Sequence, residues 1–204
     1  MKTFLEKLEN LIAEFKEQMG KPTEDKVQLS ALEPGDVFNT SFGQLIVLEH
    51  KNDIGTLVIS KDLMKEDVRF DAKEPDFANS EIKKVLDEEI LPLFEKEFGS
   101  ENIVEHEVSR ITVDVQKRYE PCLCKVRLLK FDEARVFNDY LVNKELGDWY
   151  WTMTPWSTVE RDWPKSVAVV SPSGDFDDGG CYLSYGVRPV CILKSNIFVS
   201  KKND

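Results

Sequence analysis

Residues 148–157 read DWYWTMTPWS, and at this aromatic stretch the composition of the 204-residue chain changes sharply. All four tryptophans lie within fifteen residues, from Trp149 to Trp163, and half of the ten glycines lie in the same last third. Trp149 and Trp151 stand two residues apart, as buried side chains do along a strand. Two short apolar runs, at 167–170 and 187–193, lie between turn-rich stretches. The last third is therefore predicted to consist of short strands and turns.

Two helices are predicted upstream of the aromatic stretch. Ser80 is a good N-cap candidate, Gly99 ends the pattern, and Pro92 should kink or split the helix between them. The apolar residues of this helix recur at helical spacing: Ile82, Val85, Leu86, Ile90, Leu93 and Phe94. Asp132 is expected to cap a second helix that continues to about Asn143. Its inward-facing residues are expected to be Ala134, Phe137 and Tyr140.

Short β-rich runs occupy most of the remaining chain, whereas residues 61–78 are polar and are expected to be irregular. Extended segments are predicted at 37–38, 44–49, 56–60, 103–116 and 125–130, and a hairpin-like connection at 41–43. The resulting order is strands, two helices and a β-rich last third. Because it contains no repeated βα unit, the sequence predicts an α+β fold.

Residues 2–19 carry an amphipathic helical pattern. Leu5, Leu8, Ile12, Phe15 and Met19 follow the spacing of heptad a and d positions. Glycine and proline end this pattern, and a polar linker follows. The sequence thus predicts an N-terminal helix and linker over residues 1–26 and a single domain over 27–204. Two roles for the helix stay open: it packs on its own domain, or it forms a homo-oligomer as a short coiled coil.

The composition excludes several classes of protein. At 41% apolar residues the chain can bury a core, so it is not wholly disordered. Its net charge of −11 disfavours nucleic-acid binding, because an acidic chain repels phosphate. No apolar run is long enough to span a membrane. The first residues carry no cleavable apolar block, so we expect a chain that is cytoplasmic as synthesised.

No catalytic or metal-binding motif stands out. His50 follows Glu49, and His106 lies between Glu105 and Glu107. Both are expected to be solvated, so no catalytic residue and no cofactor is assigned. Cys122 and Cys124 are too close in sequence for ordinary zinc-ligand spacing, so no metal is assigned there. The acidic residues at 175–178 do not fit an EF-hand loop and are expected to form a turn. A divalent cation near these residues stays an open question.

Two stretches near the C-terminus have the composition of binding loops, residues 156–163 and 177–185. Both combine aromatic side chains with small polar ones, which provide contact area and adaptable hydrogen bonds. Tyr182 and Tyr185 are expected to be exposed, so that alanine at either would weaken binding without lowering stability. The candidate ligand-binding residues are Trp156, Glu160, Arg161, Asp162, Trp163, Asp177, Asp178, Gly179, Gly180, Tyr182, Ser184 and Tyr185.

Several segments resemble a domain of unknown function that is common in gut bacteria and their phages. The resemblance is carried by DWYWTMTPWS (148–157), VVSPSGD (169–175), YGVRPV (185–190) and KSNIFVS (194–200), and upstream by LEPGD (32–36), IVLEH (46–50) and NIVEH (102–106). It covers roughly residues 29–200. The resemblance implies a C-type-lectin-like fold, with two helices, short antiparallel strands and a loop-rich C-terminal β-region.

This fold is similar to that of the formylglycine-generating (sulfatase-modifying) group and of the variable proteins of diversity-generating retroelements. In such variable proteins, the segments matching 159–162 and 177–185 carry the changeable side chains. The resemblance therefore implies a non-enzymatic protein that binds a protein or carbohydrate ligand through its C-terminal loops. Two alternatives stay open: a cysteine- or metal-dependent enzyme centred on Cys181 and Cys191, and a structural or assembly component of a phage particle.

Overall fold

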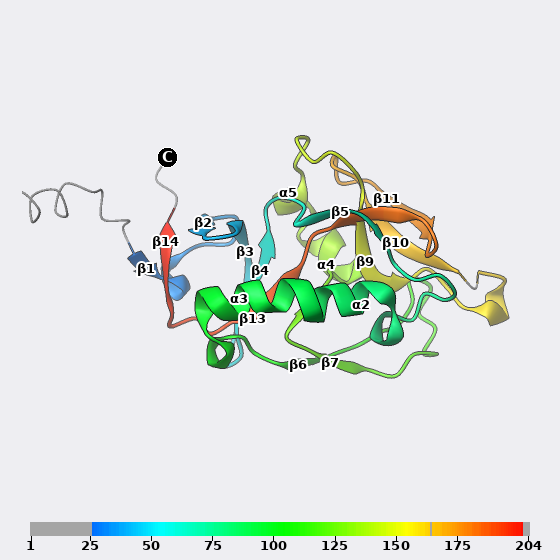
Figure 1. Ribbon diagram of the computed structural model, residues 1–204, viewed down its shortest axis with the longest axis horizontal. Helices are drawn as coiled ribbons and strands as arrows, with labels where there is room; N and C mark the ends of the chain where they lie inside the picture. The colour runs from blue at the N-terminus through cyan, green and yellow to red at the C-terminus, as the bar shows by residue number, and fades with distance from the viewer. Residues whose placement is uncertain (1–25, 164, 202–204) are drawn as a thin grey trace, which may run out of the picture.

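The computed structural model describes residues 26–163 and 165–201, which form a mixed α+β structure of sheets with one main helix (Figure 1). The α+β class predicted from the order of elements is therefore confirmed. The helix predicted at 2–19 lies outside the described residues, as does nearly all of the linker that follows it. Within the described ranges, no helix is both long and apolar enough to cross a membrane.

A seven-stranded antiparallel sheet forms one part of the fold, with the strand order β1-β14-β2-β3-β4-β13-β8. The strands are β1 (Lys26–Gln28), β14 (Phe198–Lys201), β2 (Val37–Thr40), β3 (Gly43–Lys51), β4 (Gly55–Ser60), β13 (Val190–Leu193) and β8 (Val126–Arg127). The predicted hairpin is present, since β2 and β3 pair directly. The first and last described strands also pair, with Val27 opposite Val199.

A second sheet has the order β11-β10-β9-β12-β5. Its strands are β11 (Phe176–Gly180), β10 (Ser166–Val170), β9 (Tyr150–Pro155), β12 (Ser184–Val187) and β5 (Lys65–Arg69). A separate pair joins β6 (His106–Val108) to β7 (Cys122–Cys124). The expectation that 61–78 is irregular was wrong for β5, and the loop expected at 177–185 begins as strand β11. Both are polar edge strands, which pairing with β12 and β10 holds in place despite their weak local β-propensity.

The apolar run at 187–193 is divided between the two sheets. β12 ends at Val187 in the second sheet, and β13 begins at Val190 in the first. The intervening Arg188 is fully buried. Its guanidinium donates to the carbonyl oxygens of Ser60 and Leu141, at 2.8 and 2.7 Å, and lies over the ring of Tyr150. Arg188 thus ties the crossing point to both sheets and to the second helical region.

The main helical region follows the sequence prediction closely. It consists of α2 (Glu81–Val85), a π-helical turn (Leu86–Ile90) and α3 (Leu91–Phe98). The Ser80 hydroxyl accepts the backbone N–H of Lys83, and Gly99 ends the helix at a φ of +82°. Pro92 lies in the first turn of α3. Because proline cannot donate a helical hydrogen bond, the widened turn directly before it fits the predicted interruption.

The second helical region differs from its prediction in two respects. It consists of α4 (Phe131–Val136) and α5 (Asn138–Leu141). The N-cap is Lys130 rather than Asp132, and its N–H donates to the carboxylate of Glu133 at 3.0 Å. Ala134 and Phe137 are buried as predicted, whereas Tyr140 is 40% exposed. The break between the two short helices changes the helical phase, so the apolar spacing does not continue to Tyr140.

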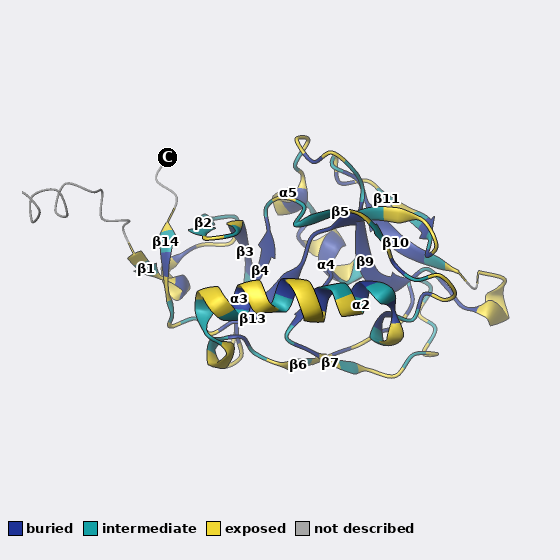
Figure 2. Cartoon of the chain, in the orientation of Figure 1, coloured by how far each residue is buried: buried dark blue, intermediate teal, exposed yellow. Residues whose placement is uncertain are grey.

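Both faces of the sheets are covered, and two apolar cores result. Leu45 and Val47 of β3 belong to the core beneath α2 and α3, which also contains Trp151. Ile46 and Leu48, which point the other way, belong to the core beneath α4 and α5. Figure 2 shows buried residues between these layers and exposed residues along the outer face of α3. Short 3-10 turns complete the described elements: Leu29–Ala31, Phe77–Asn79, Ser100–Asn102 and Val159–Arg161.

Candidate functional site

The two stretches predicted to bind a ligand meet at one end of the molecule. The first stretch forms the protruding loop between β9 and β10, at the right of Figure 1. The second runs along β11 and turns into β12. Because Ser166 at the start of β10 pairs with Gly180 at the end of β11, this loop and this turn are brought together. A shallow depression between them is lined by Asp162, Trp163, Lys165, Ser166, Asp178, Gly180 and Tyr182.

A second depression also includes Trp163, and it is lined by Val113, Asp114, Trp156, Ser157, Arg161 and Trp163. The Ser157 hydroxyl donates to the Asp114 carboxylate at 2.7 Å, and Arg161 lies 3.7 Å from the same carboxylate. Burial alone would raise the pKa of Asp114, but the hydrogen bonds from Thr112 and Ser157 and the charge of Arg161 lower it. Asp114 is therefore an anion at neutral pH and fixes the base of this depression.

Trp163 is the side chain that the two depressions share. It is 48% exposed. Trp156, in contrast, is half-buried and packs edge-on against the ring of Phe131, with 6.3 Å between the ring centroids. Of the two tryptophans predicted in this loop, Trp163 is thus the more exposed one and lines both depressions.

The segment 109–118 also belongs to this end of the molecule, although none of its residues was among the predicted site residues. Its residues line the second depression and a neighbouring one that reaches Phe131 and Arg135. Val115 is 68% exposed and has a φ of +66°, which is rare for a β-branched residue. The turn is held by Thr112, whose hydroxyl accepts the N–H of Gln116 at 2.7 Å. The apolar residues of this segment favoured an extended structure. Their pattern does not indicate that side chains such as Val115 are exposed in the folded chain.

The remaining predicted site residues are divided between surface and interior. Tyr182 is 58% exposed, and its ring covers Gly180. Gly179 is buried, whereas Asp177 and Ser184 are exposed positions in strands. Glu160 is exposed and pairs with Arg118. Tyr185 was expected to be exposed, but it is half-buried and packs against Trp151, with 4.8 Å between the ring centroids.

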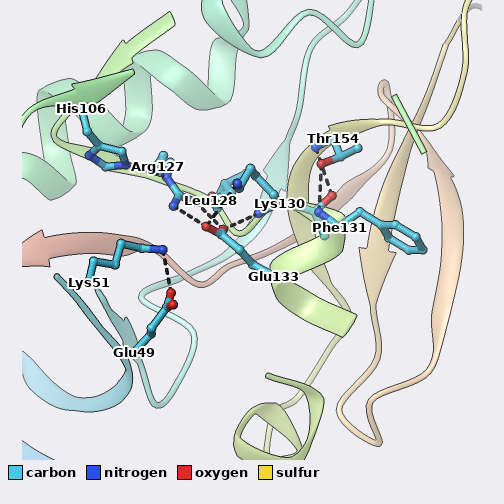
Figure 3. A network of polar contacts seen from close by, with 10 residues as sticks. Glu49, Lys51, His106, Arg127, Leu128, Lys130, Phe131, Glu133 and Thr154 are labelled. Atoms are coloured by element: carbon cyan, nitrogen blue, oxygen red, sulfur yellow. Dashed lines mark hydrogen bonds and ion pairs between the residues drawn. The ribbon is translucent and has the colours of Figure 1, made fainter. Parts of the chain in front are cut away.

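A buried polar network lies between β6, β8 and α4 (Figure 3). Arg127 makes two hydrogen bonds to the Glu133 carboxylate, at 2.6 and 2.8 Å, and its Nε donates to Nε2 of His106 at 3.1 Å. Burial and the charge of Arg127 lower the pKa of His106. The expectation that both histidines are solvated was wrong, since His106 is half-buried and His50 is held between Thr56 and Leu32. This network joins β6, β8 and the start of α4.

The four cysteines are free thiols, and three of them are buried. Burial raises the pKa of Cys181 and that of Cys191, so both thiols stay protonated at neutral pH. Because the thiolate is the reactive form, neither has the surroundings of an activated nucleophile. Across 26–163 and 165–201, no group of three or more His, Cys, Asp or Glu side chains could hold a metal ion.

Comparison with known proteins gives no relative from which a function could be transferred. No family model matches the chain, and neither a curated protein nor a solved structure matches it.

Proposed function

We propose that the chain is a non-enzymatic recognition protein that binds a protein or carbohydrate ligand at the surface around Trp163. The observation that carries this proposal is the position of Trp163, which is half-exposed between two depressions. A rigid aromatic side chain contributes large contact area at a low entropic cost. The Asp, Arg, Ser and Tyr side chains that line the two depressions can form hydrogen bonds with a ligand.

The proposed scaffold is C-type-lectin-like. Two features support this assignment: the pairing of the first and last described strands, and the presence of two helical regions on opposite faces of the sheets. The second sheet carries the protruding loop and the turn after β11 at its end. In such a scaffold the sheets hold the binding loops at fixed positions while their side chains contact the ligand.

A glycan array and a panel of immobilised proteins would test the proposal, with full-length chain as the probe. For any ligand found, Trp163→Ala and Tyr182→Ala should each weaken binding about tenfold or more, as expected for exposed aromatic anchors. Neither substitution should lower the melting temperature, because both side chains are about half exposed. Tyr185→Ala is unsuitable as a binding test, because loss of its contact with Trp151 should lower stability.

Phe198→Ala is the matched control. Phe198 is 63% exposed, and its strand β14 lies at the opposite end of the molecule from the Trp163 loop (Figure 1). It should leave binding unchanged. The proposal is wrong if the double variant Trp163→Ala, Tyr182→Ala binds the ligand as tightly as the unmodified chain.

A further inference from the structure

Cys122 and Cys124 place two sulfur atoms in contact on one face of β7. Side chains alternate along a strand, so Leu123 between them points away, and it is 62% exposed. The two Sγ atoms are 3.7 Å apart. Cys124 is 2% exposed, whereas Cys122 is only partly buried. An outside reagent therefore reaches Cys122 first, and Cys124 lies directly behind it.

The surroundings of the two thiols give them different reactivity. The hydrogen bond from the Cys124 thiol lowers the pKa of Cys122 to about 7, helped by the positive charges of Arg110 and Lys83 and opposed by burial and by the charge of Asp76. The same contact, together with burial, raises the pKa of Cys124. At neutral pH a large share of Cys122 is thiolate, while Cys124 keeps its proton. This is the asymmetry of an attacking thiol and a resolving thiol.

We propose that Cys122 and Cys124 form a dithiol–disulfide exchange site for small-molecule disulfides of the glutathione type. The Cys122 thiolate attacks one sulfur of the disulfide, which forms a mixed disulfide and releases one thiolate. That thiolate takes the proton of Cys124. The Cys124 sulfur then attacks Cys122, forms the Cys122–Cys124 bond and releases the second thiolate. The second thiolate takes from water the proton that Cys122 had released on ionising. The protein thus loses two electrons and the small molecule becomes two thiols.

Strand geometry indicates that this disulfide is easily reduced again. Positions i and i+2 of a strand are about 6.4–6.8 Å apart between Cα atoms, at the upper limit of what a disulfide spans. Disulfides that strain the backbone have more oxidising potentials and are the labile ones. The pair is therefore suited to reversible oxidation rather than to a permanent crosslink. This inference does not depend on the ligand-binding role of the Trp163 surface.

Treatment of the folded full-length chain with oxidised glutathione, followed by peptide mass mapping, tests the proposal. We expect a Cys122–Cys124 disulfide that dithiothreitol reverses, with Cys181 and Cys191 still reduced as buried controls in the same molecule. Cys124→Ser should accumulate glutathione on Cys122, because the resolving thiol is missing. Cys122→Ser should react at least about tenfold more slowly, because only buried thiols remain.

Circular dichroism would show that each variant is folded, and the mapping of the unmodified chain does not depend on the variants. The proposal is overturned if the unmodified chain forms no Cys122–Cys124 disulfide, or if oxidation falls on Cys181 or Cys191 instead. It is also overturned if Cys124→Ser leaves Cys122 unmodified, or if the purified chain carries a metal ion on the pair that prevents exchange.

Discussion

At the scale of single residues, Arg127 is a buried cation whose charge is balanced by one carboxylate. Arg127 is 2% exposed and Glu133 is 7% exposed, and the two form a bidentate pair. The Glu133 carboxylate also accepts a hydrogen bond from the N–H of Lys130, and this contact caps the start of α4. Such a pair adds little stability over an apolar substitute, but removal of one partner leaves the other charge unpaired. The main effect of Glu133 is thus to neutralise the buried charge of Arg127, rather than to add stability of its own.

We expect Glu133→Gln to lower the free energy of unfolding by about 3 kcal/mol, the typical cost of a buried charge that has lost its partner. Urea denaturation at pH 7 measures this change. Asp132→Asn is the matched control, because the neighbouring Asp132 side chain is 86% exposed and its contact with Arg135, which is itself 62% exposed, is 3.7 Å long. Its effect should be within about 0.5 kcal/mol. Equal losses for the two variants would contradict the assignment.

The stability difference between the unmodified chain and Glu133→Gln should depend on pH. Burial alone would raise the pKa of Glu133, but the charge and hydrogen bonds of Arg127 lower it below the ordinary value. A carboxyl whose pKa is lower in the folded state stabilises the protein above its unfolded pKa of about 4.3, and this contribution is lost as the pH falls. The difference in stability between the unmodified chain and Glu133→Gln should therefore be constant near neutral pH and shrink below about pH 4.

At the scale of elements, strands β3 and β4 both begin with a glycine, but only the one that begins β4 is packed closely against another strand. Gly43 and Gly55 each begin a strand, with φ values of +135° and +150° that favour glycine. A methyl group at Gly43 would meet no atom within 4 Å. A methyl group at Gly55 would lie 2.4 Å from the carbonyl oxygen of Leu193 in the paired strand β13. Backbone strain is thus common to both positions, whereas the steric conflict is confined to Gly55.

Gly55→Ala should therefore destabilise the protein more than Gly43→Ala, by about 1–3 kcal/mol, the usual cost of overpacking. The Gly43 variant measures the cost of the backbone conformation alone. Thermal or urea unfolding of the two variants provides the comparison. Losses that agree within error would mean that β4 and β13 are not packed as closely as described.

Elements whose signals are local could be predicted from the sequence, and those that depend on distant partners could not. Ser80, Pro92 and Gly99 define the main helix through capping and backbone chemistry that adjacent residues contain. The division of 187–193 between two sheets has no such signal. It depends on where Arg188 finds the carbonyl groups of Ser60 and Leu141, far away in sequence.

In the candidate site, too, the features that depend on residues distant in sequence could not be predicted. The composition of 156–163 and 177–185 identified the aromatic and small polar residues, and Trp163 and Tyr182 are indeed exposed. Composition could not distinguish Tyr182 from Tyr185, because the packing of Tyr185 depends on Trp151 in another strand. Nor could it reveal the contribution of 109–118, because only the folded chain brings this segment next to Trp163.

At the scale of the whole molecule, the last described strand pairs with the first two strands of the seven-stranded sheet. β14 lies between β1 and β2 and pairs with both. The connection before it also accepts hydrogen bonds from the first segment, since the N–H groups of Leu29 and Ser30 donate to the carbonyls of Ile197 and Ser195. Val199 is 4% exposed and belongs to the core beneath the main helix. Residues 26–31 therefore depend on a segment at the other end of the sequence.

A chain that ends at residue 197 should lose at least about 2 kcal/mol of unfolding free energy, because it lacks the burial of Val199 and every β14 hydrogen bond. Hydrogen exchange should show a larger change than the global stability does. The amides of β1, residues 26–28, should lose protection because β14 is their pairing partner, while those of β9 and β10, in the other sheet, should keep theirs. Phe198→Ala, which removes only an exposed ring from the same strand, should alter neither measurement. Retained protection at 26–28 in the shortened chain would show that β1 is held by contacts other than β14.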